Sequence, residues 1–445
     1  MPLSKIVLEN YRCFRERQEI ELAPVTVVLG KNNSGKSVLT RAPLVIATGF
    51  DTTSTAPLDL DRLGPEMVDD FRELFHDHLT GRPIKLGLTV EGGARRFALE
   101  AAIQYVDSLN SAVVSSLDLI SPELNALFLS TRLTGTEQYD TPDIDGISPT
   151  PQARISAGES LEYGIEVISR KMKRQRLTRR VGFRGLLPDL TTVPELEKFG
   201  APELSPGPVR YLSPYRERVA RHHRLPMGTP RELGVQGEGT AGILADDARR
   251  AGGALVDRVN ELLADIVPGW RIEEIPAGPL WSTVLTRGGS DVRVNLADAG
   301  TGLAQMLPIL VQCALDELRG KPLRAPLQII EEPEMHLHPA AHAELADLYL
   351  NTSRTTRTRF LIETHSETLL LRLRRRIAET DNDITADMVK VYVVEQQDGA
   401  STVRNVDIDE LGNLDDSWPD GYFSQDYLEV KALAAAQMER LDDAS

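Results

Sequence analysis

The chain has 445 residues, enough for about two or three domains, and 50 Lys and Arg against 66 Asp and Glu give a net charge of −16. A chain this acidic is not built to coat nucleic acid with its whole surface, so any such contact must come from a local basic patch. Cys13 and Cys313 make no disulfide framework and suit a reducing cytosol. No apolar run reaches the roughly 18 residues of a transmembrane helix. We therefore expect a cytoplasmic protein without membrane contact.

The first chemical signal is a glycine-rich segment that follows an apolar run at 25–29. The segment has the G-x-x-x-x-G-K-[ST] pattern of a P-loop and consists of Gly30, Lys31, Asn32, Asn33, Ser34, Gly35, Lys36 and Ser37. Its backbone N–H groups and the start of the following helix are expected to bind phosphates. We predict that Lys36 reaches the β- and γ-phosphates of a nucleotide and that the Ser37 hydroxyl binds Mg²⁺. Pro43 should end or kink that helix early.

The chain between residues 84 and 204 changes character partway. Alternating apolar residues at 84–90 and 98–105 predict β-strands. Residues 106–204 contain stretches rich in Pro, Ser, Thr and Asp, which we interpret as an insertion. Because no heptad repeat is sustained there, a long coiled coil is excluded.

The densest basic run of the chain, residues 170–180, lies in this insertion. Such a run can neutralise several phosphates of nucleic acid, with an affinity that depends strongly on salt. It is also consistent with a solvated arm, or with one docked on an acidic partner. If nucleic acid is the ligand, the residues predicted to contact it are Arg174, Arg176, Arg179 and Arg180.

Two apolar runs further along the chain end in chemically active residues. Residues 327–330 precede Glu331 and Glu332, which fits a Walker B strand in a buried parallel sheet. We predict that Glu331 holds Mg²⁺, directly or through water. Glu332 is predicted to orient or deprotonate the attacking water, a role typically worth about 10²–10⁴ in rate. His365 follows the run 360–362 and is placed to hydrogen-bond the γ-phosphate or the water.

The order of these segments resembles an ABC-type ATPase head of the branch that contains RecF, SMC and OLD (overcoming lysogenization defect) proteins. Residues 6–14, 331–339 and 363–366 carry the resemblance. It implies an α/β fold, with a mixed central sheet and an antiparallel side sheet. A mostly helical insertion and a short C-terminal extension are expected to complete it. The catalytic side chains would be Lys36, Glu332 and His365, and the cofactors ATP and Mg²⁺.

The resemblance also implies a signature loop that caps the γ-phosphate held by a second subunit. The matching stretch is 298–305, in which Gly300, Gly302 and Gln305 are the predicted nucleotide contacts. Glycine N–H groups at the start of a helix can approach a phosphate closely. Ala304 departs from the family, where many relatives carry Ser, and this removes one hydroxyl donor. The expected assembly is a head-to-tail homodimer, and the sequence does not exclude a larger one.

Four regions follow from this interpretation. They are 1–105 with the P-loop, the insertion 106–204, 205–395 with the other site motifs, and the extension 396–445. Within 205–395, Arg216 and Arg218 would either stabilise phosphate charge or form salt bridges. The extension is too short for a fused nuclease domain.

The function that we expect combines this chemistry with a second resemblance. Residues 211–218, 234–239 and 418–423 resemble standalone bacterial ATPases associated with anti-phage defence. We therefore expect an ATPase that senses nucleic acid and controls a separately encoded effector. The alternatives are an ATP-driven protein-interaction switch without DNA binding, and a DNA-repair ATPase.

Overall fold

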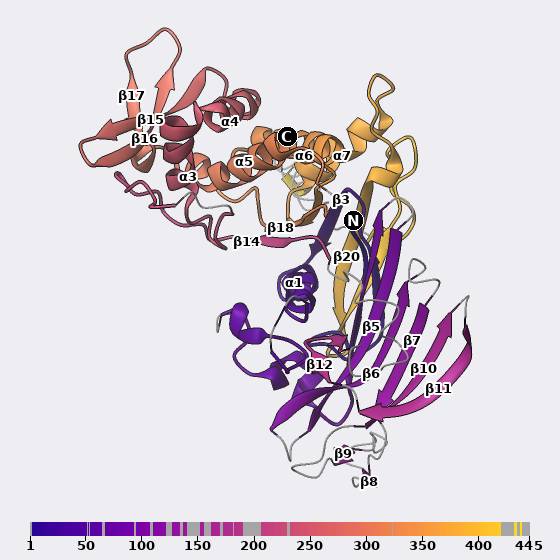
Figure 1. The fold of residues 1–445 in the computed structure, drawn as a ribbon. Coiled ribbons are helices and arrows are strands. Elements are labelled where there is room, and N and C mark those ends of the chain that lie inside the picture. The colour runs from indigo at the N-terminus through magenta and orange to yellow at the C-terminus, as the bar shows by residue number, and fades with distance from the viewer. Residues whose placement is uncertain are drawn as a thin grey trace.

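The computed structural model describes residues 2–419, 431–433 and 437, and it shows three layers (Figure 1). A six-stranded central sheet lies between a helical layer on one face and helix α1 with an eight-stranded antiparallel sheet on the other. Residues inside these ranges that are not described are 51, 53, 65–66, 93–94, 107–109, 122–126, 134–136, 140–151, 155–161, 170–171, 181, 190–205, 229–231 and 323, and between 121 and 180 only strand backbone is described.

The central sheet is parallel except for one edge strand. Its order is β14 (Val209–Leu212), β18 (Leu327–Glu331), β19 (Arg359–Glu363), β3 (Val25–Gly30), β20 (Val389–Gln397) and the antiparallel β21 (Ala400–Val406). Strands β3, β18 and β19 therefore end at the same edge. Glu331 at the end of β18 pairs in register with Glu363 at the end of β19. This edge brings segments from both ends of the chain together.

Strand β3 is buried along its whole length because both faces of the sheet are covered. Val25, Val27 and Leu29 pack into the core under the helical layer, and Val28 packs into the core on the α1 side. A strand covered on both faces has no solvent-facing positions, so it reads as a continuous apolar run instead of an alternating one. The run at 25–29 indicated a buried strand for this reason.

The helical layer consists of α3 (Thr240–Asp246), α4 (Ala254–Ile266), α5 (Thr301–Arg319), α6 (Pro339–Thr356) and α7 (Glu367–Ala378). A small antiparallel sheet extends it, formed by β15 (Trp270–Ala277), β16 (Leu280–Arg287) and β17 (Arg293–Asn295). Short turns of 3₁₀-helix lie at Leu60–Arg62, Phe71–Leu74, His76–His78, Leu296–Asp298 and Ala386–Met388, and a π-helical turn at Asp247–Ala251. Among the helices described, none has the length and apolar composition to cross a membrane.

Helix α1 (Lys36–Ala47) follows the P-loop and does not end at its proline. The helix continues for a further turn beyond Pro43, whose side chain is buried. An internal proline removes one helical hydrogen bond. Leu39, Val45 and Ile46 are buried in the core between α1 and the antiparallel sheet, and this packing holds the last turn in place. The expectation of an early end to the helix was therefore wrong.

The α/β class, the mixed central sheet and the antiparallel side sheet are confirmed, but the mostly helical insertion is wrong for the residues described. The side sheet has the order β11-β10-β7-β6-β5-β4-β1-β2 and continues through the insertion. Its strands are β1 (Leu3–Glu9), β2 (Gln18–Glu21), β4 (Ile84–Gly92), β5 (Arg95–Val106), β6 (Ser111–Ser121), β7 (Leu127–Leu133), β10 (Glu162–Ser169) and β11 (Met172–Arg180). Two short hairpins accompany it, β8 (Glu137–Tyr139) with β9 (Gln152–Arg154), and β12 (Phe183–Arg184) with β13 (Leu187–Pro188).

The physical reason for this difference is visible in the sequence of β10. Its residues alternate, with Tyr163, Ile165 and Val167 separated by small or charged residues, and this period suits a strand. The Pro- and Ser-rich stretch before it and the basic run after it hide the alternation. Residues 396–419 of the C-terminal extension are described, whereas of the helix expected at 427–441 only 431–433 and 437 are, and these four are helical.

Asn260 joins the helical layer to the small sheet through a buried side-chain amide. Its Nδ2 donates to the carbonyl of Ile272 at 2.9 Å, and its Oδ1 accepts from the Ile272 N–H at 2.6 Å. An unpaired buried backbone group costs about 1–3 kcal/mol. We expect Asn260→Ala to lower the free energy of unfolding by roughly 3 kcal/mol in urea denaturation. Asn351→Ala, at an exposed position of α6, is the control and should change it by less than about 0.5 kcal/mol. Equal effects would show that the amide does not join the two layers.

Candidate functional site

The P-loop connects the end of β3 to the start of α1. Two residues far apart in the sequence, Cys13 and Ser401, support it. Gly35 has φ +101°, and a Cβ at this position would lie 2.6 Å from the sulfur of Cys13. Ser401, in the β20–β21 hairpin, donates from Oγ to the carbonyl of Ser34 at 2.7 Å and from its N–H to the carbonyl of Cys13 at 2.7 Å. Cys13 and Ser401 are supports that sequence patterns did not reveal. Cys13 lies in the stretch 6–14 that carries the family resemblance but was given no role there, and Ser401 belongs to no motif.

Lys36 is buried at the start of α1, and its ammonium group lies against the loop. Nζ donates to the carbonyls of Gly30 and Lys31, both at 3.0 Å, and lies 4.0 Å from Glu363 Oε1. Burial lowers the pKa of Lys36. The ammonium group therefore lies inside the loop, where a phosphate would be held. Ser34 Oγ is also buried there without a hydrogen-bond partner. These groups fit an anionic ligand.

Glu331 is buried at the end of β18 and is fully engaged within the protein. Arg41 of α1 donates to both carboxylate oxygens, from Nε at 2.6 Å and from Nη2 at 2.5 Å. The hydroxyl of Tyr211 donates at 2.9 Å and that of Thr40 at 3.3 Å. Burial and the charge of Glu331 raise the pKa of Tyr211, so its hydroxyl remains a donor. The predicted role of Glu331 in holding Mg²⁺ stays a prediction.

Glu363 lies beside Glu331, at the end of β19, and sequence patterns missed it. Its Oε1 accepts from the Ser37 hydroxyl at 3.1 Å, and its Oε2 accepts from Thr40 Oγ1 at 3.3 Å. Burial, and next the charge of Glu331, raise the pKa of Glu363 to about 7. The signal in the sequence was available, because Glu363 ends an apolar run just as Glu331 does. His365, two residues later in the same segment, carries the motif, and Glu363 has no role in it.

Glu332 has a backbone conformation that is uncommon for a residue other than glycine. Its φ is +44°, and its N–H donates to the carbonyl of Glu363 at 2.8 Å. Such conformations cost about 1–3 kcal/mol and are concentrated at functional sites. Glu332 is half-buried directly after the Walker B strand. This geometry agrees with, but does not test, the predicted role in orienting water.

His365 is exposed at the same edge of the sheet, and its backbone is fixed by Glu334. The His365 N–H and the Thr364 hydroxyl both donate to Glu334 Oε1, at 2.7 and 2.6 Å. Partial desolvation of the ring, and then the positive charge of Lys36, lower the pKa of His365. The imidazole is therefore neutral at pH 7, where it can donate one hydrogen bond and accept another.

The predicted signature residues fall into two groups. Gly300 precedes α5, and a Cβ there would meet nothing within 4 Å. Gly302 packs within its own chain, since a Cβ there would lie 2.5 Å from the carbonyl oxygen of His336. Gln305 accepts from the N–H of Arg216 and donates to its carbonyl, both at 3.2 Å. Gly302 and Gln305 thus connect α5 to the site of their own subunit.

Arg216 is buried behind the Walker B strand and Arg218 is exposed. Nη2 of Arg216 donates to the carbonyl of Glu331 at 3.1 Å, and its Nε and Nη1 have no hydrogen-bond partner. Desolvation lowers the pKa of Arg216. The salt-bridge alternative therefore does not describe Arg216, whose contact is with backbone.

The four basic residues predicted for nucleic acid lie on strand β11, at the edge of the side sheet. In the backbone register of β11 with β10, Arg176 is paired with Glu166 and Arg179 with Tyr163. Arg180 is paired with Glu162. The side chains of Arg174 and the others lie outside the described part of the chain. A lysine- and arginine-rich sequence is one way in which edge strands avoid pairing with other chains. Protection of an exposed strand edge is therefore a further explanation of the basic run.

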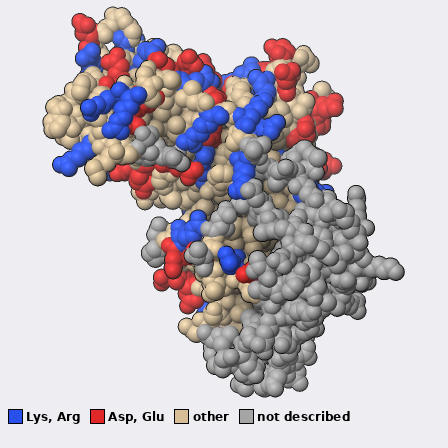
Figure 2. Space-filling model, in the orientation of Figure 1, with Lys and Arg blue, Asp and Glu red and all other residues tan. Residues whose placement is uncertain are grey.

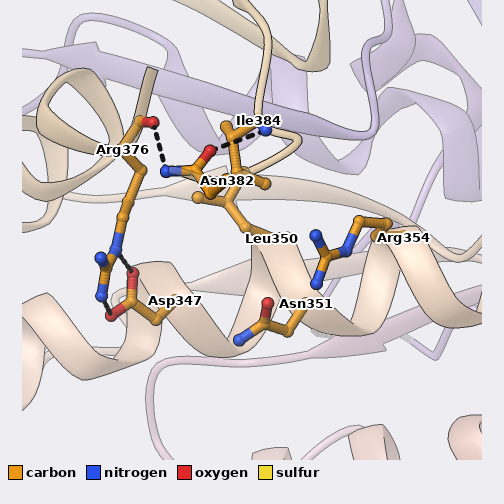
Figure 3. A pocket seen from close by; sticks show the side chains of 7 residues that line it. All are labelled: Asp347, Leu350, Asn351, Arg354, Arg376, Asn382 and Ile384. Carbon is orange, nitrogen blue, oxygen red and sulfur yellow. Dashed lines mark hydrogen bonds and ion pairs between the residues drawn. The ribbon is translucent and has the colours of Figure 1, made fainter. Parts of the chain in front are cut away.

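A pocket of about 170 Å³ lies elsewhere, between α6 and α7 (Figure 3). Arg376 donates from Nε and Nη2 to the two oxygens of Asp347, each at 2.7 Å. Asn382 donates to the carbonyl of Arg376 at 3.1 Å and accepts from the N–H of Ile384 at 2.7 Å. Asp347, Arg376 and Asn382 therefore already have partners in the protein.

The parallel sheet, the P-loop and the residues at the adjoining strand ends define a P-loop ATPase. The family described as "AAA domain, putative AbiEii toxin, Type IV TA system" matches residues 25–372, and the chain belongs to this family. A family described as "Protein of unknown function (DUF3696)" matches residues 384–432. No curated protein matches the chain.

Solved structures of SMC head domains are distantly similar. The head domain from Thermotoga maritima is 11% identical, with a TM-score of 0.40, over 92% of this chain and 100% of that chain. A Smc head domain from Pyrococcus furiosus, bound to the C-terminal domain of ScpA, is 12% identical, with a TM-score of 0.43, over 91% and 96% of the two chains.

The Arg41–Glu331 pair yields a prediction about stability. Removing one partner of a buried ion pair leaves an uncompensated charge, whereas replacing both partners is often neutral. We expect Arg41→Met to lower the free energy of unfolding by about 3 kcal/mol, and Arg41→Met with Glu331→Gln to restore most of it. Chemical denaturation measures both. The control is Arg404→Met, which breaks an exposed pair with Glu395 and should cost at most about 1 kcal/mol. A double variant as unstable as the single one would contradict this account.

Proposed function

We propose that this ATPase is Mg²⁺-dependent, closes as a head-to-tail homodimer on ATP, and uses hydrolysis to control a separately encoded partner in bacterial defence. The observation that supports it best is the meeting of Lys36, Ser37, Glu332 and His365 at one edge of the central sheet. These residues come from three strand ends that are far apart in the sequence. Their types match the needs of phosphate binding, cation binding and water activation.

Each residue has a distinct task in this proposal. The loop amides and Lys36 bind the phosphates, while Ser37 and one of the two neighbouring carboxylates, Glu331 or Glu363, would hold Mg²⁺. Mg²⁺, when bound, neutralises charge on the phosphates. Glu332 orients the attacking water and accepts its proton. Neutral His365 hydrogen-bonds the γ-phosphate or the water.

The dimer is proposed from the open position of Gly300. The start of α5 leaves space around this glycine, and helix N-termini bind phosphates. A second copy would present this helix end to the nucleotide held by the first. Because Gly302 and Gln305 contact the site of their own chain, docking at Gly300 would also reach the Walker B strand of the docking subunit.

The proposed role in defence is supported by the family description, which names a putative toxin of a type IV toxin–antitoxin system. A description that names a toxin of a toxin–antitoxin system agrees with an effector or partner protein. Nucleic-acid sensing is supported by the basic composition of strand β11. In the described part of the face in Figure 2, basic and acidic side chains are interspersed over the helical lobe. This mixture favours the second candidate, a protein-interaction switch without DNA binding. The third candidate, a DNA-repair ATPase, needs DNA binding as the first does.

The task assigned to Glu332 leads to a test of turnover and assembly together. Glu332→Gln keeps the shape of the side chain but removes its ability to take a proton. We expect kcat to fall by about 10²–10⁴ while ATP binding persists. An ATP-bound dimer should then accumulate, as measured by light scattering with and without ATP. Glu395→Gln, at an exposed strand position, should leave both unchanged. Unchanged turnover in Glu332→Gln would remove this residue from the role of base.

Nucleic-acid sensing is tested by ATP turnover with and without duplex and single-stranded DNA, at two salt concentrations. We expect DNA to stimulate turnover, and the stimulation to weaken at higher salt because phosphate contacts release counterions. Reversing the charge of Arg174, Arg176, Arg179 and Arg180 should abolish stimulation and leave basal turnover intact. Turnover indifferent to DNA would support the protein switch instead. Stimulation that survives charge reversal would place the contact elsewhere.

A further inference from the structure

We propose that Glu363, and not the Walker B residue Glu331, is the carboxylate that contacts the divalent cation of the bound nucleotide, directly or through one water. Glu331 instead remains paired with Arg41. This inference rests on the proposed Mg²⁺ dependence and names the residue that carries it. It assigns a ligand role to a residue outside the P-loop and Walker B motifs.

The first argument is that Glu331 has little free capacity. A carboxylate offers about four lone-pair sites. Nε and Nη2 of Arg41 and the hydroxyl of Tyr211 take up three of them. The single hydroxyl proton of Thr40 lies 3.3 Å from both Glu331 and Glu363 and is shared between the two carboxylates. Because the Glu331 carboxylate is buried, moving Arg41 away leaves its charge without compensation.

The second argument is that Glu363 is held by contacts that a cation can replace. Its two hydrogen-bond donors are the hydroxyls of Ser37 and Thr40, and both can rotate. Ser37 is the residue that the P-loop pattern assigns to Mg²⁺. A cation held by Ser37 and Glu363 would replace the 3.1 Å hydrogen bond that joins them, and the ion pair that it would disturb is the long one, 4.0 Å, between Glu363 and Lys36. Mg²⁺ is typically held by one or two carboxylates, with water and phosphate as its other ligands.

The third argument concerns charge. Arg41 neutralises Glu331, so Glu363 is the carboxylate that faces Lys36 and an incoming triphosphate. When it is ionised and no cation is present, this carboxylate repels ATP. With a cation it becomes a ligand. The proposal therefore predicts opposite effects of Glu363 on nucleotide affinity in the absence and presence of Mg²⁺, which general damage to the fold would not produce.

The test measures binding of a fluorescent, non-hydrolysable ATP analogue by anisotropy, in EDTA and in Mg²⁺. The variants are Glu363→Gln, the double variant Arg41→Met with Glu331→Gln, and the control Glu379→Gln on the far end of α7. We expect Glu363→Gln to lose at least about tenfold of the Mg²⁺ enhancement, while its affinity in EDTA is unchanged or higher. The double variant and the control should keep the enhancement. Mn²⁺ bound with the analogue, followed by electron paramagnetic resonance, should weaken in Glu363→Gln alone.

The possible outcomes distinguish a failure of the Glu363 assignment from a failure of the proposed Mg²⁺ dependence. An enhancement retained in Glu363→Gln, or lost in the double variant, overturns the assignment while leaving Mg²⁺ dependence in place. A wild-type protein whose affinity is the same in EDTA and Mg²⁺ overturns the proposed cofactor, and the assignment with it. A loss of affinity in EDTA as well as in Mg²⁺ would mean that Glu363 supports the loop instead, which also overturns it.

Discussion

The ion pair between the partly exposed Arg41 and the buried Glu331 carboxylate is the interaction on which the arrangement of the site depends. It joins the helix after the P-loop to the Walker B strand across 290 positions of sequence. Tyr211, at the sheet edge, donates to the same carboxylate and brings β14 into the contact. Since the carboxylate is almost fully buried, its partners must all be in place before its charge is compensated. The pair thus fixes the distance between the phosphate-binding loop and the acidic end of strand β18.

The chemistry of the site could be predicted from the sequence because each reactive residue follows a buried apolar run. Parallel strands end at one edge, so Lys36, Ser37 and Glu331 were expected to meet there. The order of the strands could not be predicted in this way. The order β18-β19-β3 places β19 in the middle, and this neighbourhood alone brings Glu363 to Ser37. Motifs describe residues that are close in sequence, and they do not show which strands are neighbours in the sheet.

The insertion and the signature stretch show two further limits. The alternation in β10 is short and lies between stretches of low apolar content. These stretches favoured a prediction of loops and hid the strand pattern. Gly302 and Gln305 have the residue types of a phosphate-binding turn, yet they also satisfy contacts within their own chain. Glycine gives room to a backbone carbonyl as readily as to a phosphate, and residue type alone does not distinguish the two.

The position of β3 has a consequence for how the protein is made. This N-terminal strand lies between β19 and β20, and the Ser401 hydroxyl supports the P-loop from 367 positions away. During synthesis β3 cannot pair with β19 and β20 until both have been made. The nascent chain therefore carries an exposed apolar strand for most of translation. Synthesis must pass the β20–β21 hairpin before the P-loop has its neighbouring strands and the support of Ser401. Nucleotide binding is therefore coupled to the completion of the central sheet.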